Sequence, residues 1–153
     1  MLVRLLMILA ALALGPTLSF AQERVWILDQ SDQEIFLVFG VPDTDDIGIS
    51  FWCTQKSGIV RFYLPESVPK QKFARTIDLK MEVASKTYPF KSKASLNEES
   101  GTLSLETELK ASDPIFSALG SANHFAVKVG SRNHVFPLGE ADLPGFLDMC
   151  KKP

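Results

Sequence analysis

IGISFWCT, residues 47–54, is the segment from which the architecture can be inferred. Alternate residues of this segment are apolar, and in a strand they would share one face. These residues are Ile47, Ile49, Phe51 and Cys53. The positions between them hold Gly48, Ser50 and Trp52. The alternation therefore predicts a β-strand that directs Cys53 into a core and Trp52 toward the opposite face.

The N-terminal 21 residues have the three parts of a secretory signal peptide. Arg4 supplies a positive charge, residues 5–14 are all apolar, and Ser19 and Ala21 are small residues at the −3 and −1 positions of a cleavage site. The apolar run is shorter than the roughly 20 residues of a spanning helix, which argues against the alternative of an uncleaved anchor. We expect a signal peptide over 1–21, a single β-rich domain over 22–153, a periplasmic or secreted location, and no membrane span after cleavage.

The two cysteines, Cys53 and Cys150, are predicted to form a disulfide. Two cysteines in an exported chain pair most simply with each other. No Cys-x-x-Cys motif and no neighbouring base supports the alternative of a redox or nucleophilic thiol. Cys150 falls on the apolar stripe of a helix expected over Glu140–Lys151. The disulfide would fasten that helix to the strand over residues 47–54.

Short alternating segments continue along the rest of the chain. The clearest are residues 77–83 and 103–109, which have one apolar face and one charged face. The segment Glu34–Phe39 is apolar on both faces, which is typical of a central strand or of one covered on its second side. A short helix is expected after Ser112 as N-cap, ending at Gly120. The pattern predicts a mainly β fold, an antiparallel β-sandwich or barrel of about eight or nine strands with two short helices, the last one C-terminal.

The motifs give no support to catalysis or to a cofactor. The acidic segment Asp43–Asp46 begins like a calcium loop, but Thr54 occupies the twelfth place, where a bidentate glutamate is needed. His124 and His134 have no metal-ligand spacing, and a hairpin turn around Ser131–Arg132 would place His134 opposite Val129. Neither a Gly-x-Ser-x-Gly motif nor a glycine-rich phosphate loop is present. We expect no enzymatic activity, no cofactor and no metal site.

The charge distribution allows two interpretations. The formal net charge of −2 does not favour a nucleic-acid partner. Basic residues are concentrated between residues 51 and 95, so acidic and basic strands could lie side by side and offset one another. Alternatively, the basic residues could form a patch that attracts an anionic partner. This candidate patch comprises Lys70, Lys72, Arg75, Lys80, Lys86, Lys91 and Lys93.

Among the aromatic residues, Trp52 is the main candidate for a binding role. Because Cys53 points inward, Trp52 points outward or into a second layer. It either packs beneath a loop or helix, or serves as an exposed anchor for a partner or a glycan. The candidate partner-binding residues are Trp52, Lys70, Lys72, Arg75 and Lys80.

The layout of Phe51-Trp52-Cys53, the β-rich run that follows and Cys150 is loosely similar to periplasmic lysozyme inhibitors of the small β-barrel type. The Ser-Gly-x-x-Tyr inhibitory loop of that family is absent, so the similarity implies no functional residues here.

The expected function is that of a small, exported, non-enzymatic protein of the bacterial periplasm. It would bind a protein or an anionic envelope component. The alternative is a secreted inhibitor of a hydrolase, or an effector that binds a host or competitor protein. An inhibitor would present an exposed loop with a polar and aromatic tip, whereas a binding protein would have a concave apolar pocket or a basic groove.

Overall fold

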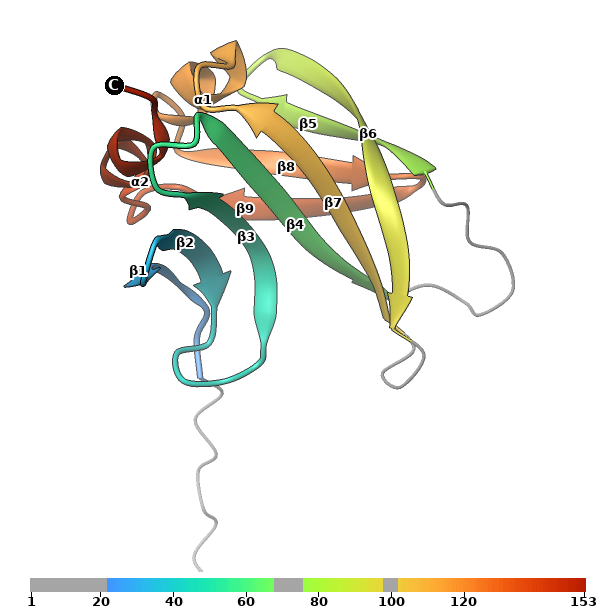
Figure 1. The fold of residues 1–153 in the computed structure, drawn as a ribbon. Coiled ribbons are helices and arrows are strands. Elements are labelled where there is room, and N and C mark those ends of the chain that lie inside the picture. Colours follow the sequence, from blue (N-terminus) through green and yellow to red (C-terminus); the bar gives the residue numbers. More distant parts are fainter. Residues whose placement is uncertain (1–21, 68–75, 98–101) are drawn as a thin grey trace, which may run out of the picture.

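The chain forms one antiparallel sheet that curls into a half-barrel, with both helices at one end (Figure 1). This computed structural model describes residues 22–67, 76–97 and 102–153. In chain order the elements are β1 (Val25–Ser31), β2 (Glu34–Gly40), β3 (Ile47–Thr54), β4 (Ile59–Ser67), β5 (Thr76–Val83), β6 (Lys86–Asn97), β7 (Thr102–Lys110), α1 (Pro114–Leu119), β8 (His124–Val129), β9 (Arg132–Pro137) and α2 (Leu143–Cys150). The strands are ordered β1-β2-β3-β4-β7-β6-β5-β8-β9. The predicted mainly β fold is confirmed, in its barrel-like form.

The two edge strands of the sheet, β1 and β9, meet at one point. Trp26 of β1 donates a hydrogen bond from Nε1 to the carbonyl oxygen of Pro137 in β9, at 2.5 Å. Phe39 of β2 packs edge-on against Phe136 of β9, with ring centroids 5.9 Å apart. Side chains therefore bring the edges of the half-barrel together where no backbone ladder joins them.

Phe51, in the middle of β3, lies at the centre of the core. Its ring centroid is 5.7 to 6.3 Å from those of four other aromatic rings, which come from β1, β4, α1 and β8. These rings belong to Trp26, Phe62, Phe116 and Phe125. The face of β3 that the alternation predicted to be apolar is thus the face on which the sheet closes.

The disulfide between Cys53 and Cys150 is present, as predicted. The Cα atoms are 5.8 Å apart, the sequence separation is 97 residues, and both side chains are completely buried. Backbone contacts reinforce the connection, because the amides of Lys56 and Gly58 donate to the carbonyl oxygens of Met149 and Cys150 at 2.8 and 2.9 Å. The end of α2 is consequently fixed to the β3–β4 turn.

The helix boundaries differ from those expected. The N-cap of α1 is Asp113 and not Ser112, because the Asp113 carboxylate accepts a hydrogen bond from the amide of Ile115 at 3.0 Å. Likewise α2 begins at Leu143 and not at Glu140, because Asp142 caps the amide of Gly145 at 3.0 Å. In both cases an aspartate caps the helix and a proline lies in the first turn: Pro114 directly follows Asp113, and Pro144 is two residues after Asp142.

The β8–β9 hairpin turns at Gly130 and Ser131, not at Ser131 and Arg132. Gly130 adopts a φ of 59°, which glycine tolerates at the first position of a tight turn. Arg132 therefore pairs with Val129, and His134 pairs with Val127 instead of Val129. His124 pairs with Pro137, so the two histidines are not cross-strand partners.

Candidate functional site

Trp52 lies on the outer face of the sheet, where it is half-buried between residues of the two neighbouring strands. Phe36 of β2 and Arg61 of β4 are its direct cross-strand partners. The rings of Phe36 and Trp52 stack with centroids 6.3 Å apart, and the Arg61 guanidinium carbon lies 4.4 Å from the Trp52 ring centroid. No second layer of secondary structure covers Trp52 in the described part of the chain; side chains of the same sheet flank it.

The side chains of Phe36, Trp52 and Arg61 form a row on the outer face of the sheet, and this row continues to β7. Arg61 donates from Nε to Glu108 Oε1 at 2.9 Å, and these residues are direct cross-strand partners. A guanidinium over an indole face contributes about 0.5–1 kcal/mol at an exposed site. The carboxylate and the neighbouring strand hold Arg61 over Trp52, so the indole is presented in one orientation.

An apolar cleft of about 400 Å³ adjoins this row on the outer face of β1 and β2. Its apolar walls come from both strands, from the loop after β2 and from the first residue of β3: Ile27, Phe36, Val38, Val41, Pro42 and Ile47. Ile47, which the alternation placed with the core residues, is only partly buried. Phe36 belongs to the cleft and also stacks on Trp52, so the two features are continuous. We call the cleft together with Trp52 the outer cleft.

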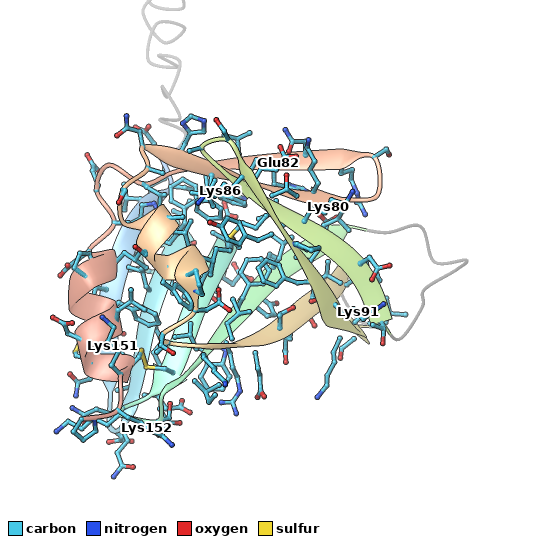
Figure 2. The ribbon with its side chains drawn as sticks, turned by 90° about the horizontal axis from the view of Figure 1, so that it is seen from above. Lys80, Glu82, Lys86, Lys91, Lys151 and Lys152 are labelled. Carbon is cyan, nitrogen blue, oxygen red and sulfur yellow. A yellow bond between two sulfur atoms is a disulfide. The ribbon has the colours of Figure 1, made fainter. Side chains whose placement is uncertain are left out.

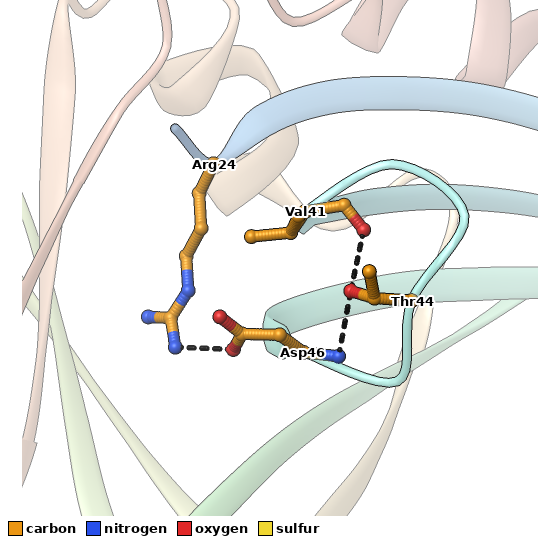
Figure 3. A network of polar contacts seen from close by, with 4 residues as sticks. All are labelled: Arg24, Val41, Thr44 and Asp46. Carbon is orange, nitrogen blue, oxygen red and sulfur yellow. Dashed lines mark hydrogen bonds and ion pairs between the residues drawn. The ribbon is translucent and has the colours of Figure 1, made fainter. Parts of the chain in front are cut away.

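The loop from Val41 to Asp46 forms one side of the outer cleft and is held by its own hydrogen bonds (Figure 3). Thr44 Oγ1 donates to the carbonyl oxygen of Val41 at 2.9 Å and accepts from the amide of Asp46 at 3.1 Å. Arg24 Nη2 lies 2.5 Å from Asp46 Oδ1. A Cβ atom at Gly40 would lie 2.7 Å from the Asp46 carbonyl oxygen, so this close approach requires glycine.

The rim of the outer cleft is acidic. Asp29, Asp43 and Asp46 line it, and Arg24 offsets only the last of these. An apolar depression with carboxylates at its edge is suited to a partner that inserts an apolar side chain and carries basic residues beside it. The sequence gives one indication of this apolar surface, because β2 is apolar on both of its faces. The structure leaves Phe36 and Val38 of that second face half-exposed.

The candidate basic patch can be placed only in part. Lys70, Lys72 and Arg75 lie outside the described residues. The four lysines that are described stand on β5 and β6, where acidic residues are interleaved with them (Figure 2). Lys91 Nζ lies 3.0 Å from Asp78 Oδ1, and Lys93 pairs across strands with Glu106. Lys80 is exposed and faces Lys128, which contacts Glu82 at 2.7 Å.

Glu66 forms a buried charged cluster that no sequence motif indicated. Its side chain is 1% exposed, with Arg132 Nη1 2.7 Å from Oε2 and His134 Nε2 in contact with Oε1. The short separations define ion pairs. The contact with His134 is an ion pair only when the imidazole is protonated. Glu66 lies two residues after the buried Leu64, so the inward face of β4 continues beyond Pro65.

The Glu66 cluster connects β4 to β9, which are not neighbours in the sheet. A hollow of about 430 Å³ lies beside the cluster. Its described lining includes two further charged residues, Arg24 and Asp46, but no hydroxyl or thiol side chain. A carboxylate and an imidazole without a nucleophile between them do not form a nucleophilic triad. We therefore assign the cluster a structural role in holding β9 across the open side of the sheet.

No group of three or more metal-ligating side chains that could hold an ion is found in residues 22–67, 76–97 and 102–153. Within the same ranges, no helix is long and apolar enough to cross a membrane.

Comparison with known proteins does not place the chain in a family. No protein-family model matches it, and no curated protein gives a significant match. A solved structure, that of invasion-associated protein B from Bartonella henselae, matches at 11% sequence identity with a TM-score of 0.44, over 81% of this chain and 87% of the other. We base no conclusion on a likeness this distant.

Proposed function

We propose that this is an exported, non-enzymatic binding protein of the bacterial periplasm, and that it holds a protein partner in the outer cleft. The observation that carries the proposal is the half-exposed apolar cleft on β1 and β2, which is continuous through Phe36 with Trp52. Burying apolar surface contributes about 25 cal/mol per Å². Tryptophan and arginine are also enriched among the residues that dominate binding energy at interfaces.

The acidic rim favours a partner that carries basic residues. Asp29 and Asp43 carry no ion-pair partner within the described residues, whereas Asp46 pairs with Arg24. We infer that the partner presents an apolar side chain flanked by lysine or arginine. Opposite charges across the rim would increase the association rate and orient the partner.

The inhibitor alternative receives less support from the described loops. An inhibitory loop was expected to have a polar and aromatic tip. None of the connections among residues 22–67, 76–97 and 102–153 contains an aromatic residue. A concave apolar surface, which was expected of a binding protein, is present.

Site-specific photo-crosslinking in cells of the source organism tests the proposal. A photoreactive phenylalanine analogue at Val38 should yield one dominant adduct of defined mass. The same analogue at Val135, which is 58% exposed on β9, is the control and should not yield that adduct. Failure of the Val38 protein to give an adduct, or the same adducts from both positions, would contradict the proposal.

The charge of the rim is tested in the same assay. The double change Asp29→Lys and Asp43→Lys should reduce the yield of the Val38 adduct. Asp32→Lys and Asp148→Lys, on the exposed β1–β2 turn and on α2, provide a control with the same change in net charge. Equal adduct yields from the two double variants would show that the rim does not select the partner.

A further inference from the structure

A second hollow lies at the end of the sheet where α2 meets the β3–β4 turn. Its volume is about 430 Å³. It is lined by Ser57, Gly58, Ile59, Lys110, Ala111, Ser112, Lys151 and Lys152. Figure 2 shows Lys151 and Lys152 beside the end of α2, well apart from the lysines of β5 and β6. Three lysines and no carboxylate therefore surround one depression, which we call the lysine hollow.

The backbone around the lysine hollow is tied together by hydrogen bonds and by the disulfide. The amide of Gly58 donates to the carbonyl oxygen of Cys150, and the amide of Ala111 donates to that of Gly58, each at 2.9 Å. Cys150 is itself bonded to Cys53 of β3. The three segments that line the hollow are therefore fixed relative to one another, although they are distant in the sequence.

Gly58 also fixes the position of Lys152. Gly58 has a φ of 75°, and the position that a Cβ atom would occupy faces the aliphatic part of the Lys152 side chain. A Cβ atom there would lie 3.0 Å from Lys152 Cγ and 3.2 Å from Lys152 Cε. The aliphatic part of Lys152 thus lies against the turn at Gly58.

The charges of the lysine hollow are largely uncompensated. Lys151 has one loose contact with a carboxylate, 3.8 Å from Asp148 Oδ1. Lys110 and Lys152 have no ion-pair partner within the described residues. By contrast, Lys91 and Lys128 on the sheet are each within 3.0 Å of a carboxylate. The hollow is therefore a distinct concentration of positive charge on a slightly acidic protein.

We propose that the lysine hollow is a binding site for a phosphate-bearing group. A lysine ammonium is a compact charge with three donors, and it is a common ligand for phosphate oxygens. Three of them around a depression of this size favour a compact anion with more than one negative charge. Such a group could belong to a soluble phosphate compound or to a lipid headgroup, and the two sources share the same recognition chemistry.

Titration of the ¹⁵N-labelled mature protein with inorganic pyrophosphate tests the site. Saturable amide shifts should appear at residues 57–59, 110–112 and 151–152, and they should weaken as salt is added. The double change Lys110→Glu and Lys152→Glu should lower the affinity at least about tenfold. Lys80→Glu and Lys86→Glu, with the same change in net charge, should preserve most of it.

Sedimentation with vesicles distinguishes the two sources. Binding to phosphatidic acid vesicles but not to phosphatidylcholine vesicles, lost in the Lys110 and Lys152 variant, would identify a lipid headgroup. Binding of pyrophosphate without vesicle binding would identify a soluble ligand. The proposal is overturned if neither probe binds, or if the two double variants weaken binding equally, because binding would then depend only on net charge.

Discussion

Trp26 and Pro137, separated by 111 residues, are joined by a hydrogen bond from the indole Nε1 to the carbonyl oxygen. This contact links the first strand of the sheet to the last, and it is made by a side chain at a place where the backbone ladder is open. The curl of the sheet thus depends on a few contacts between its edges, which makes those contacts good targets for mutation.

Replacing Trp26 with phenylalanine should loosen the two edge strands without unfolding the protein. The change removes one hydrogen bond, which is worth about 1 kcal/mol. We expect faster amide hydrogen exchange in β1 and β9 and little change in the central strands. Trp52→Phe is the matched control, because Trp52 lies away from the edges, and it should leave exchange in β9 unchanged. Unaltered exchange in Trp26→Phe would show that the edges are held by other contacts.

Removing the disulfide should destabilise the protein substantially. In the chain-entropy model, a loop of about 100 residues corresponds to about 4.7 kcal/mol, and measured effects are often smaller. The double variant Cys53→Ala and Cys150→Ala should therefore show a large decrease in the free energy of unfolding in urea. The unreduced native protein, once unfolded, should contain no titratable thiol. Detection of two thiols would contradict the observed bond.

Removing the partners of Glu66 should destabilise the protein more than removing Glu66 itself. Removing Arg132 and His134 together leaves a carboxylate buried without a partner, which costs about 3–5 kcal/mol. Changing Glu66 to leucine leaves Arg132 and His134, whose side chains are 39% and 34% exposed and can reach water, so it should cost much less. Urea denaturation of the two variants near neutral pH measures the difference. Equal losses of stability would mean that packing, not the buried charge, dominates at this position.

The loop beside the outer cleft should depend on Gly40. Alanine there would place a Cβ atom 2.7 Å from the Asp46 carbonyl oxygen, and we expect a loss of about 1–3 kcal/mol from the resulting displacement. Gly139→Ala is the control, because its Cβ would meet no atom within 4 Å. Thermal unfolding of both variants tests this contrast, and equal melting temperatures would rule out the close approach at Gly40.

Several features could be predicted from residue patterns alone because they depend on local periodicity. The alternation around Phe51 indicated the core face of β3. The presence of just two cysteines in a chain with an export signal indicated the disulfide, and the helical spacing placed Cys150 on a buried stripe. These features follow from the period of a strand or helix, which a single sequence shows directly.

The outer cleft and the lysine hollow could not be predicted in this way. Phe36 and Trp52 come from different strands, and Lys110 and Lys152 come from segments that only the disulfide and the β3–β4 turn bring together. Glu66 is buried on β4, and its partners Arg132 and His134 come from an edge strand on the other side of the curled sheet. Local periodicity carries no information about which distant strands meet.

By itself, therefore, the sequence determined the β class, the face of β3 that forms the core and the cysteine pair. Only the tertiary structure decided that the sheet closes on itself, that the second apolar face of β2 remains half-exposed beside Trp52, and that three lysines surround one hollow. The physical reason is that strand period is a local property of the chain. The curl of a sheet, by contrast, arises from the summed packing of side chains across strands that are far apart in the sequence.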